Sequence, residues 1–138
     1  MMIRLYQDGD YEAITDCVEP FVASGDFSLI KDMGIYLTAT EDDVPLGCGG
    51  IVMTGAAEGE VWLRLSWQIC ESPVTLMRIL RAGFEIVKES FGISRLTARV
   101  QNGFGAGERM VKRFGFQDTN ETMTIFDTKY RIYQWQTQ

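Results

Sequence analysis

The stretch that decides the fold runs from Gly59 to Phe116 and reads GEVWLRLSWQICESPVTLMRILRAGFEIVKESFGISRLTARVQNGFGAGERMVKRFGF. Its start, Glu60 to Gln68, is rich in strand-forming residues and predicts a central β-strand. Ser72 and Pro73 then predict the start of a helix, because serine favours the N-cap and proline favours the first helical position. Apolar side chains at helical spacing extend this helix to Gly92, since glycine favours the C-terminal cap. They are Met77, Leu80, Phe84, Val87 and Phe91.

A second strand, Leu96 to Val100, follows this helix. A strand, a helix of this length and another strand imply two parallel neighbours that are joined by a right-handed crossover. Gln101 to Gly107 is expected to be a loop, and a short helix then reaches Phe114. A last hairpin, Met123 to Phe126 and Arg131 to Trp135, closes the sheet. This half of the chain therefore predicts a mixed sheet with helices on both faces.

The N-terminal part predicts further elements of the same α/β pattern. Ile3 to Leu5 is expected to be a short strand. The polar turn Asp8-Gly9-Asp10 offers an N-cap to a helix from about Tyr11 to Ala23, which Pro20 ends or kinks. Ser24-Gly25-Asp26 opens a second helical stretch through Ile30. The elements fit one α/β unit, and residues 1–138 are expected to form a single domain.

A two-residue period indicates a β-hairpin before the central strand. Its strands are expected at Ile35 to Thr40 and at Leu46 to Met53, around a turn at Asp42-Asp43-Val44-Pro45. Three glycines interrupt the second strand. They are Gly47, Gly49 and Gly50. Glycines in a strand indicate a bulge or the close approach of another backbone, and the alternative is a surface that faces a ligand.

The composition excludes several classes of function. The 138 residues include 46% hydrophobic and 23% charged side chains, with a formal net charge of -6. A negative chain disfavours nucleic acid or an anionic membrane as the main partner, because both attract cationic surfaces. Acidic residues stand where a signal peptide has its apolar core, and no apolar run reaches the roughly 20 residues that span a bilayer. We therefore expect a cytoplasmic protein.

Histidine is absent, which excludes nucleophile systems with a histidine base and metal sites built on histidine. Cys17, Cys48 and Cys70 are far apart and have no paired spacing, so neither a disulfide framework nor a zinc site is predicted. Cys70 lies close to the start of a helix, where a thiol pKa can be lowered; the alternative is a small buried side chain. Any general base must therefore be a carboxylate or a perturbed Lys, Tyr or Cys side chain.

The order of elements, together with the ending Lys112-Arg113-Phe114-Gly115-Phe116, resembles the GNAT superfamily of acyl-CoA-dependent N-acyltransferases. Within it, Gly59-Glu60-Val61-Trp62 and Leu96 to Val100 are more similar to divergent GNAT-like proteins of tailed bacteriophages and prophages than to the bacterial enzymes. The resemblance implies a mixed central sheet of six to seven strands flanked by about four helices. Two parallel central strands splay apart in this fold.

The resemblance also implies acetyl-CoA as the cofactor. In the superfamily the pantetheine arm lies in the gap between the splayed strands. The pyrophosphate sits on backbone amides of a Q/R-x-x-G-x-G/A loop that opens the long helix. The cofactor-binding residues implied here are Leu65, Ser66, Trp67, Gln68, Ile69, Cys70, Ser72, Val74, Asn102 and Arg109.

The loop from Gln68 to Val74 departs from the family pattern in four ways. Both glycines are absent, and Pro73 has no N–H to offer. The hydroxyl of Ser72 can take up another N–H within the chain, and Glu71 puts a negative charge where a diphosphate would arrive. All four loop features weaken the same interaction with the cofactor.

A further departure lies outside the loop. The tyrosine that protonates the leaving thiolate in the family corresponds to Val111.

Two functions of different class follow. In the first, the chain transfers an acetyl group from acetyl-CoA to a small-molecule or peptide amine, with Glu60 as the base and water, Tyr130 or Tyr133 as the acid. Glu41 is a second carboxylate candidate for the base. In the second, the chain is a catalytically inactive GNAT-shaped module that binds a phage or host protein. The edge left by the splayed strands would allow a homodimer in either case.

Overall fold

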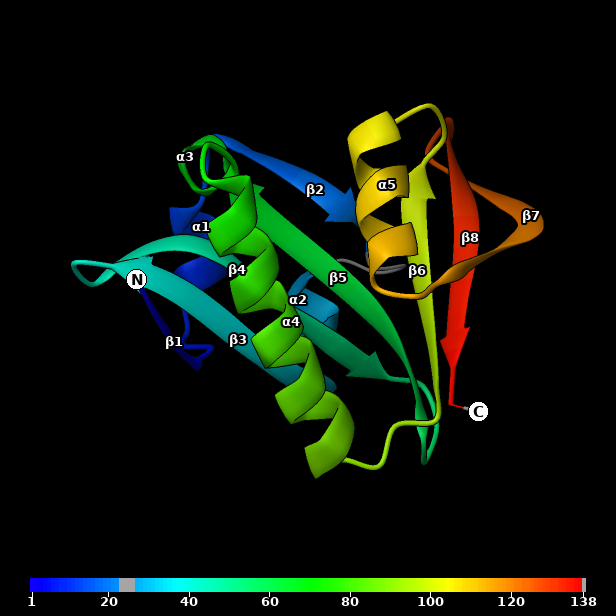
Figure 1. Cartoon of the computed structure of the whole chain (residues 1–138), viewed down its shortest axis with the longest axis horizontal. Coiled ribbons are helices and arrows are strands. Elements are labelled where there is room, and N and C mark those ends of the chain that lie inside the picture. Colours follow the sequence, from blue (N-terminus) through cyan, green and yellow to red (C-terminus); the bar gives the residue numbers. More distant parts are fainter. Residues whose placement is uncertain (23–26, 138) are drawn as a thin grey trace.

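The computed structural model describes residues 1–22 and 27–137, and in this part of the chain it contains eight strands and five helices (Figure 1). The strands are β1 (Met2–Leu5), β2 (Cys17–Phe21), β3 (Gly34–Glu41), β4 (Val44–Met53), β5 (Glu58–Ser66), β6 (Arg95–Gln101), β7 (Gln117–Ile125) and β8 (Thr128–Gln136). The helices are α1 (Asp10–Ala13), α2 (Phe27–Ile30), α3 (Trp67–Cys70), α4 (Pro73–Ser90) and α5 (Gly105–Arg113). The sheet has the order β1-β3-β4-β5-β6-β8-β7, and β2 pairs with β5 outside this path.

Two hydrophobic cores lie on the two faces of the sheet. The front core lies on the side of α4 and α5 in Figure 1 and receives Leu63 and Leu65 from β5. The back core receives Trp62 from the same strand, together with Phe27 and Ile30 of α2. Successive residues of a strand point to opposite faces, so β5 is buried on both of them. This confirms its predicted place as a central strand.

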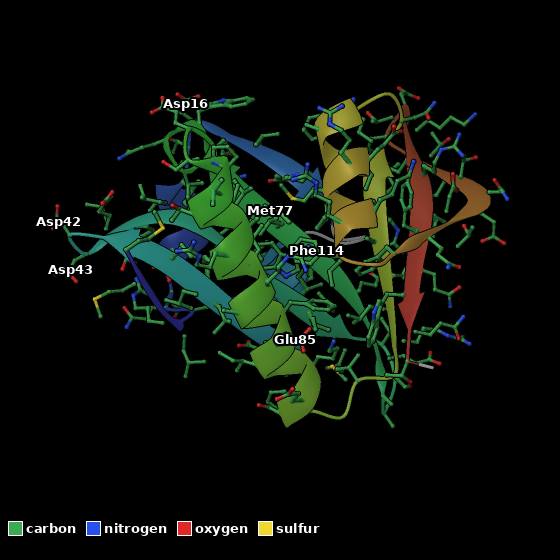
Figure 2. The ribbon with its side chains drawn as sticks, viewed as in Figure 1. Asp16, Asp42, Asp43, Met77, Glu85 and Phe114 are labelled. Carbon is green, nitrogen blue, oxygen red and sulfur yellow. The ribbon has the colours of Figure 1, made fainter. Side chains whose placement is uncertain are left out.

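The predicted pairing of the main strands is confirmed. β3 and β4 form an antiparallel hairpin, β5 and β6 are parallel neighbours, and β7 and β8 form the last hairpin. Asp42 and Asp43 make the first hairpin turn (Figure 2), with φ values of 51° and 64° that aspartate tolerates in tight turns. Gly92 has a φ of 58°, as expected of a glycine that ends a helix. The sheet gains one strand over the six to seven expected, and that strand is β2.

The helix expected from Tyr11 to Ala23 is wrong, because α1 is short and the chain continues as β2. Nε of Arg64 on β5 donates to the carbonyl oxygens of Tyr11 and Ile14, at 3.1 and 2.9 Å. In a longer helix these carbonyl oxygens would accept hydrogen bonds from backbone amides of the helix itself. Pro20 then lies at an irregular point of the β2–β5 pairing, where its missing N–H is tolerated. The second helix ends at Ile30 as expected, and its predicted start at residues 24–26 lies outside the described residues.

Several element boundaries differ from the expectation. β7 runs from Gln117 to Ile125 and not from Met123 to Phe126, and Phe126 lies in the turn that follows it. Trp67 begins α3 and does not end β5, because the hydroxyl of Ser66 accepts the N–H of Ile69 at 3.3 Å as an N-cap. α5 begins at Gly105, so the loop predicted for Gln101 to Gly107 is shorter. These shifts move the candidate cofactor loop onto a turn of helix.

The apolar stripe predicted for α4 is confirmed at Val87, which is buried, and at Leu80 and Phe84, which pack against the front core, and it fails at its two ends. The residues of α4 that are buried against the front core are Leu76, Gly83 and Val87. Met77 is only half-buried, and Phe91 is 49% exposed at the end of the helix. A Cβ added at Gly83 would be 3.3 Å from Cδ1 of Leu37, so this part of α4 packs closely against β3.

Close packing between strands explains the glycines of β4. The register shifts between Ala39 and Thr40, which places a bulge beside Gly47. A Cβ at Gly50 would lie 2.1 Å from the carbonyl oxygen of Ile35, so only glycine fits there. Both the bulge and the close approach of another backbone are therefore present.

Asp10 anchors α1 to the edge of the sheet. Its carboxylate accepts hydrogen bonds from Nη1 and Nη2 of Arg4 at 2.6 and 2.9 Å, and from the hydroxyl of Thr38 at 2.7 Å. The backbone N–H of Gln7 donates to it at 2.9 Å. Burial by itself raises the pKa of this carboxyl, but the hydrogen bonds from Arg4, Thr38 and Gln7 outweigh burial and lower the pKa below its ordinary value.

Replacing Asp10 by asparagine is expected to lower the free energy of unfolding by about 2 kcal/mol at neutral pH, because Arg4 loses its buried partner. Since the folded-state pKa is lowered, the stabilisation is present above the unfolded-state pKa and is lost as the pH falls through the folded-state value. Urea unfolding of both proteins at neutral pH and at about pH 3 measures this. A difference between them that does not shrink in acid would contradict the ion pair.

Candidate functional site at the fork between β5 and β6

β5 and β6 pair only over their first halves. Their parallel register ends at Val61 and Ala98, and we call the region beyond this point the fork. On its other edge β5 stays paired with β4 from Gly59 to Leu65. The fork is therefore where the two central strands part, as the resemblance predicted.

β2 occupies the fork. Cys17 pairs with Ser66, Val18 with Leu65 and Phe21 with Leu63. This pairing lies along the edge of β5 that faces β6, because β4 takes the other edge. Figure 1 shows β2 spanning the opening between the carboxyl ends of β5 and β6.

Contacts on both sides hold β2 in this position. The backbone N–H of Val22 donates to the carbonyl oxygen of Arg99 on β6 at 3.0 Å. A Cβ added at Gly107 of α5 would lie 3.2 Å from the carbonyl oxygen of Pro20. The side chain of Phe21 is 6% exposed and belongs to the front core. The strand is thus tied to β5, β6 and α5 together.

Glu60, the candidate base, lies just before the fork and is held by an ion pair. Nη2 of Arg99 donates to its Oε1 at 2.8 Å, and the side chains of Arg99 and Glu60 are 9% and 15% exposed. Nε of Arg99 also contacts Sδ of Met123 at 3.1 Å. The carboxylate thus neutralises a buried guanidinium, which is a structural task.

The candidate acids lie on β8. Tyr130 is half-buried and pairs with Gln101, further along β6 than the Thr97 that pairs with Glu60. Tyr133 is 1% exposed in the front core, and burial raises the pKa of its hydroxyl. Glu60 precedes Val61, which points into the front core, so Glu60 and Tyr133 are on opposite faces of the sheet. Glu41, the other base candidate, is exposed at the end of β3.

In the segment that corresponds to the cofactor loop, three backbone amides donate hydrogen bonds within the chain. Ser66 accepts from the N–H of Ile69, and the N–H groups of Glu71 and Ser72 donate to the carbonyl oxygens of Gln68 and Ile69 at 3.2 and 3.3 Å. Ser72 is at the predicted N-cap of α4, but its side chain makes no capping hydrogen bond. The predicted use of Ser72 as a side-chain cap is therefore wrong.

The other candidate cofactor residues are spread over buried and exposed positions. Ile69 is 2% exposed in the front core, whereas Trp67 and Val74 are 52% and 73% exposed. Asn102 is exposed, and its backbone N–H donates to the carbonyl oxygen of Lys129 at 2.9 Å. Arg109 is exposed on α5. These side chains do not converge on one pocket wall.

The thiol of Cys70 packs against the front core, and burial raises its pKa. The structure therefore favours the alternative of a small buried side chain over a reactive thiol. Burial also raises the pKa of Cys48 to about 12. In residues 1–22 and 27–137 no group of three or more Cys, Asp or Glu side chains is placed to hold a metal ion. In the same part of the chain no helix is long and apolar enough to cross a membrane.

Sequence reasoning missed Arg99 and Arg64, the two arginines that organise the fork. Arg64 donates from Nη1 to Oε1 of Glu19 at 2.6 Å and stacks its guanidinium 4.3 Å from the ring centre of Tyr11. Both arginines alternate with apolar residues in predicted strands, a pattern typical of solvent-exposed positions. Pro20 is the one local signal that the segment before it does not continue as a helix.

Comparison with known proteins identifies the fold. No protein-family model and no curated protein sequence matches the chain. A GNAT family acetyltransferase from Elizabethkingia anophelis, solved with acetyl-CoA bound, superposes with a TM-score of 0.71 at 12% identity, over 99% of this chain and 97% of that one. The ribosomal-protein-alanine N-acetyltransferase from Brucella melitensis gives a TM-score of 0.71 at 13% identity, over 99% of this chain and 100% of that one. An acetyltransferase of the GNAT family from Streptococcus pneumoniae gives 0.68 at 12% identity, over 98% and 99%. The chain therefore has the GNAT fold, as its sequence predicted.

Proposed function

We propose that this chain uses the GNAT fold as a binding or assembly protein and does not transfer acyl groups. The observation that carries the proposal is the position of β2, which pairs with β5 along the edge that borders the fork. The gap that would hold a pantetheine arm is thus filled by the chain itself. An extended ligand can pair with a strand only where the strand's N–H and C=O groups are unpaired.

Two features of this region weigh against acetyl-CoA binding. Leu63 and Leu65 pair with β4 on one side and with β2 on the other. The amides of Ile69, Glu71 and Ser72, which would meet the pyrophosphate, donate within the chain. These three amides are therefore not available to a phosphate, whereas the first-turn amides of Val74 and Thr75 in α4 are not capped by the Ser72 side chain.

The partner of such a module would be another protein. The resemblance to GNAT-like proteins of bacteriophages and prophages suggests a phage or host protein in this role. The buried ion pair between Glu60 and Arg99 supports the proposal, because it gives the candidate base a structural use.

An acetyl-CoA-dependent N-acyltransferase is the second candidate. One observation favours it: β5 and β6 part after Val61 and Ala98, with Glu60 beside the point of separation. The Elizabethkingia anophelis protein with this fold binds acetyl-CoA. For this chain to do so, β2 would have to leave β5.

Titration calorimetry with acetyl-CoA and with CoA tests the proposal, and we expect no binding at millimolar ligand. A micromolar dissociation constant, about 8 kcal/mol of binding free energy, would contradict it and favour the second candidate. A Glu71→Gly, Pro73→Gly double variant locates the cause. It is also expected not to bind, because β2 still occupies the fork; binding by this variant alone would place the defect in the loop.

A further inference from the structure

The front core contains an apolar cavity that borders the fork, with Phe21, Leu63 and Leu65 among its lining residues. It lies between α4 and the sheet formed by β3, β4 and β5, and has a volume of about 120 Å³. We call it the α4 cavity. Its walls are apolar side chains from both layers. They include Leu37, Ala39, Ile51, Val61, Leu63 and Leu80.

The α4 cavity is mainly apolar and offers water few partners, although the buried Nε1 of the lining residue Trp62 makes no hydrogen bond within the described part of the chain. The backbone groups of β4 that border it are paired with β3 on one side and with β5 on the other. Thr38 is the one lining residue with a hydroxyl, and its Oγ1 donates to Asp10 at 2.7 Å. An apolar cavity of about 150 Å³ in another protein stays dry and binds benzene. A cavity of this size and lining therefore accepts a hydrocarbon group of about six carbons.

Cationic side chains stand over aromatic residues that line the cavity between α4 and α5. Phe84 and Phe114 line it, and Figure 2 shows Phe114 between the two helices. The guanidinium of Arg81 lies 5.8 Å from the ring centre of Phe114, and its Nη2 donates to the carbonyl oxygen of Arg113 at 3.1 Å. Nζ of Lys88 lies 5.1 Å from the ring centre of Phe84.

This cationic character is local. The chain as a whole has a formal net charge of -6. On α4 and α5, however, six basic side chains stand against three acidic ones. The basic ones are Arg78, Arg81, Lys88, Arg109, Lys112 and Arg113, and the acidic ones are Glu85, Glu89 and Glu108. These basic side chains would therefore attract an anionic head group beside the cavity.

We propose that the α4 cavity binds the hydrocarbon tail of a small amphiphile that has an anionic head group, with the head beside Arg81. The tail enters an apolar space in which water has few hydrogen bonds to lose. The head stays at the surface, where Arg81 is exposed. The α4 cavity shares Phe21 of β2 and Leu63 and Leu65 of β5 with the fork, but its remaining walls come mainly from β3, β4 and α4, so the site is present whether or not the chain is an enzyme.

The test is an NMR titration of the intact protein with hexanoate, hexyl phosphate, hexanol and acetate. Hexanoate and hexanol are expected to bind saturably at millimolar concentration, with nuclear Overhauser contacts from the tail to Val61 and Leu80. Acetate, which has the head without the tail, is expected not to bind. The ratio of the hexanoate and hexyl phosphate affinities identifies the preferred anion.

Two variants separate the tail from the head. Ala39→Leu places three more carbons in the cavity and is expected to abolish hexanol binding while raising the melting temperature. Arg81→Gln is expected to weaken hexanoate about three-fold and to leave hexanol unchanged, as suits an exposed charge pair. Arg78→Gln, on the exposed side of the same helix, is the matched control and should change neither.

Three results would overturn the inference. The first is the absence of saturable binding of hexanol and hexanoate by the wild type. The second is undiminished hexanol binding in a folded Ala39→Leu variant. If that variant does not fold, tail contacts in the wild type that do not reach Val61 and Leu80 would overturn the inference instead. The third is an equal loss of hexanoate affinity in Arg81→Gln and Arg78→Gln, which would mean that the head group does not lie beside Arg81.

Discussion

Replacing Phe21 by alanine is expected to lower the free energy of unfolding by about 4 kcal/mol. Phe21 belongs to β2, is 6% exposed and packs into the front core, so the truncation loses buried area and leaves a void. Because the same side chain lines the α4 cavity, the new void would be continuous with it. Urea or thermal unfolding of the variant measures the loss.

The control for this prediction is Phe126→Ala. Phe126 is 97% exposed in the turn between β7 and β8, and its truncation is expected to change stability by less than about 0.5 kcal/mol. If Phe21→Ala cost no more than the control, β2 would not be part of the core. The account of a filled fork would then be wrong.

Replacing Gly50 by alanine is expected to destabilise the protein by about 3 kcal/mol or more. A Cβ at this position would lie 2.1 Å from the carbonyl oxygen of Ile35 and 2.8 Å from Cα of Tyr36, both on the paired strand β3. Backbone atoms of a paired strand cannot move away as the end of a flexible side chain can. Thermal unfolding of the variant tests this.

Gly55→Ala is the matched control for this substitution. A Cβ at Gly55 would meet no atom closer than 3.8 Å, and its φ is not in the left-handed region. Its stability should stay within about 0.5 kcal/mol of the wild type. Equal effects of the two substitutions would mean that β3 and β4 are not as close as described.

The sequence predicts the part of the fold in which local pattern and tertiary packing agree. β5 and β6 are made of strand-forming residues, and α4 starts at Pro73 and ends before Gly92. The tight turn at Asp42 and Asp43 was also visible as a polar break between two alternating segments. In these places the spacing of the apolar residues matches the period of the helix or strand that forms.

β2 could not be predicted because its conformation is set by distant residues. The segment from Tyr11 to Val22 has apolar residues at helical spacing, and its helix stops because Arg64 takes the carbonyl oxygens at the end of α1. The extended form is then stabilised by pairing with β5, which is remote in sequence. Tertiary context overrides local preference in such cases.

The sequence predicts the parting of the two central strands, whereas the chemistry of the candidate site stays a prediction. Glu60 does lie beside the fork, as the resemblance implied. Its ion pair with Arg99 could not be foreseen, because a strand pattern does not say which charged residue is buried with a partner. The loop departures at Glu71 and Pro73 were visible in the sequence, whereas the filled gap needed the structure.

Amide hydrogen exchange at Val22 tests the filled fork most directly, because its N–H donates to the carbonyl oxygen of Arg99 across the fork at 3.0 Å. Exchange measured with and without millimolar acetyl-CoA should be slow in both cases, comparable to the amides of the central strands. Fast exchange in the free protein, or protection that disappears when acetyl-CoA is added, would show that β2 does not hold the gap closed.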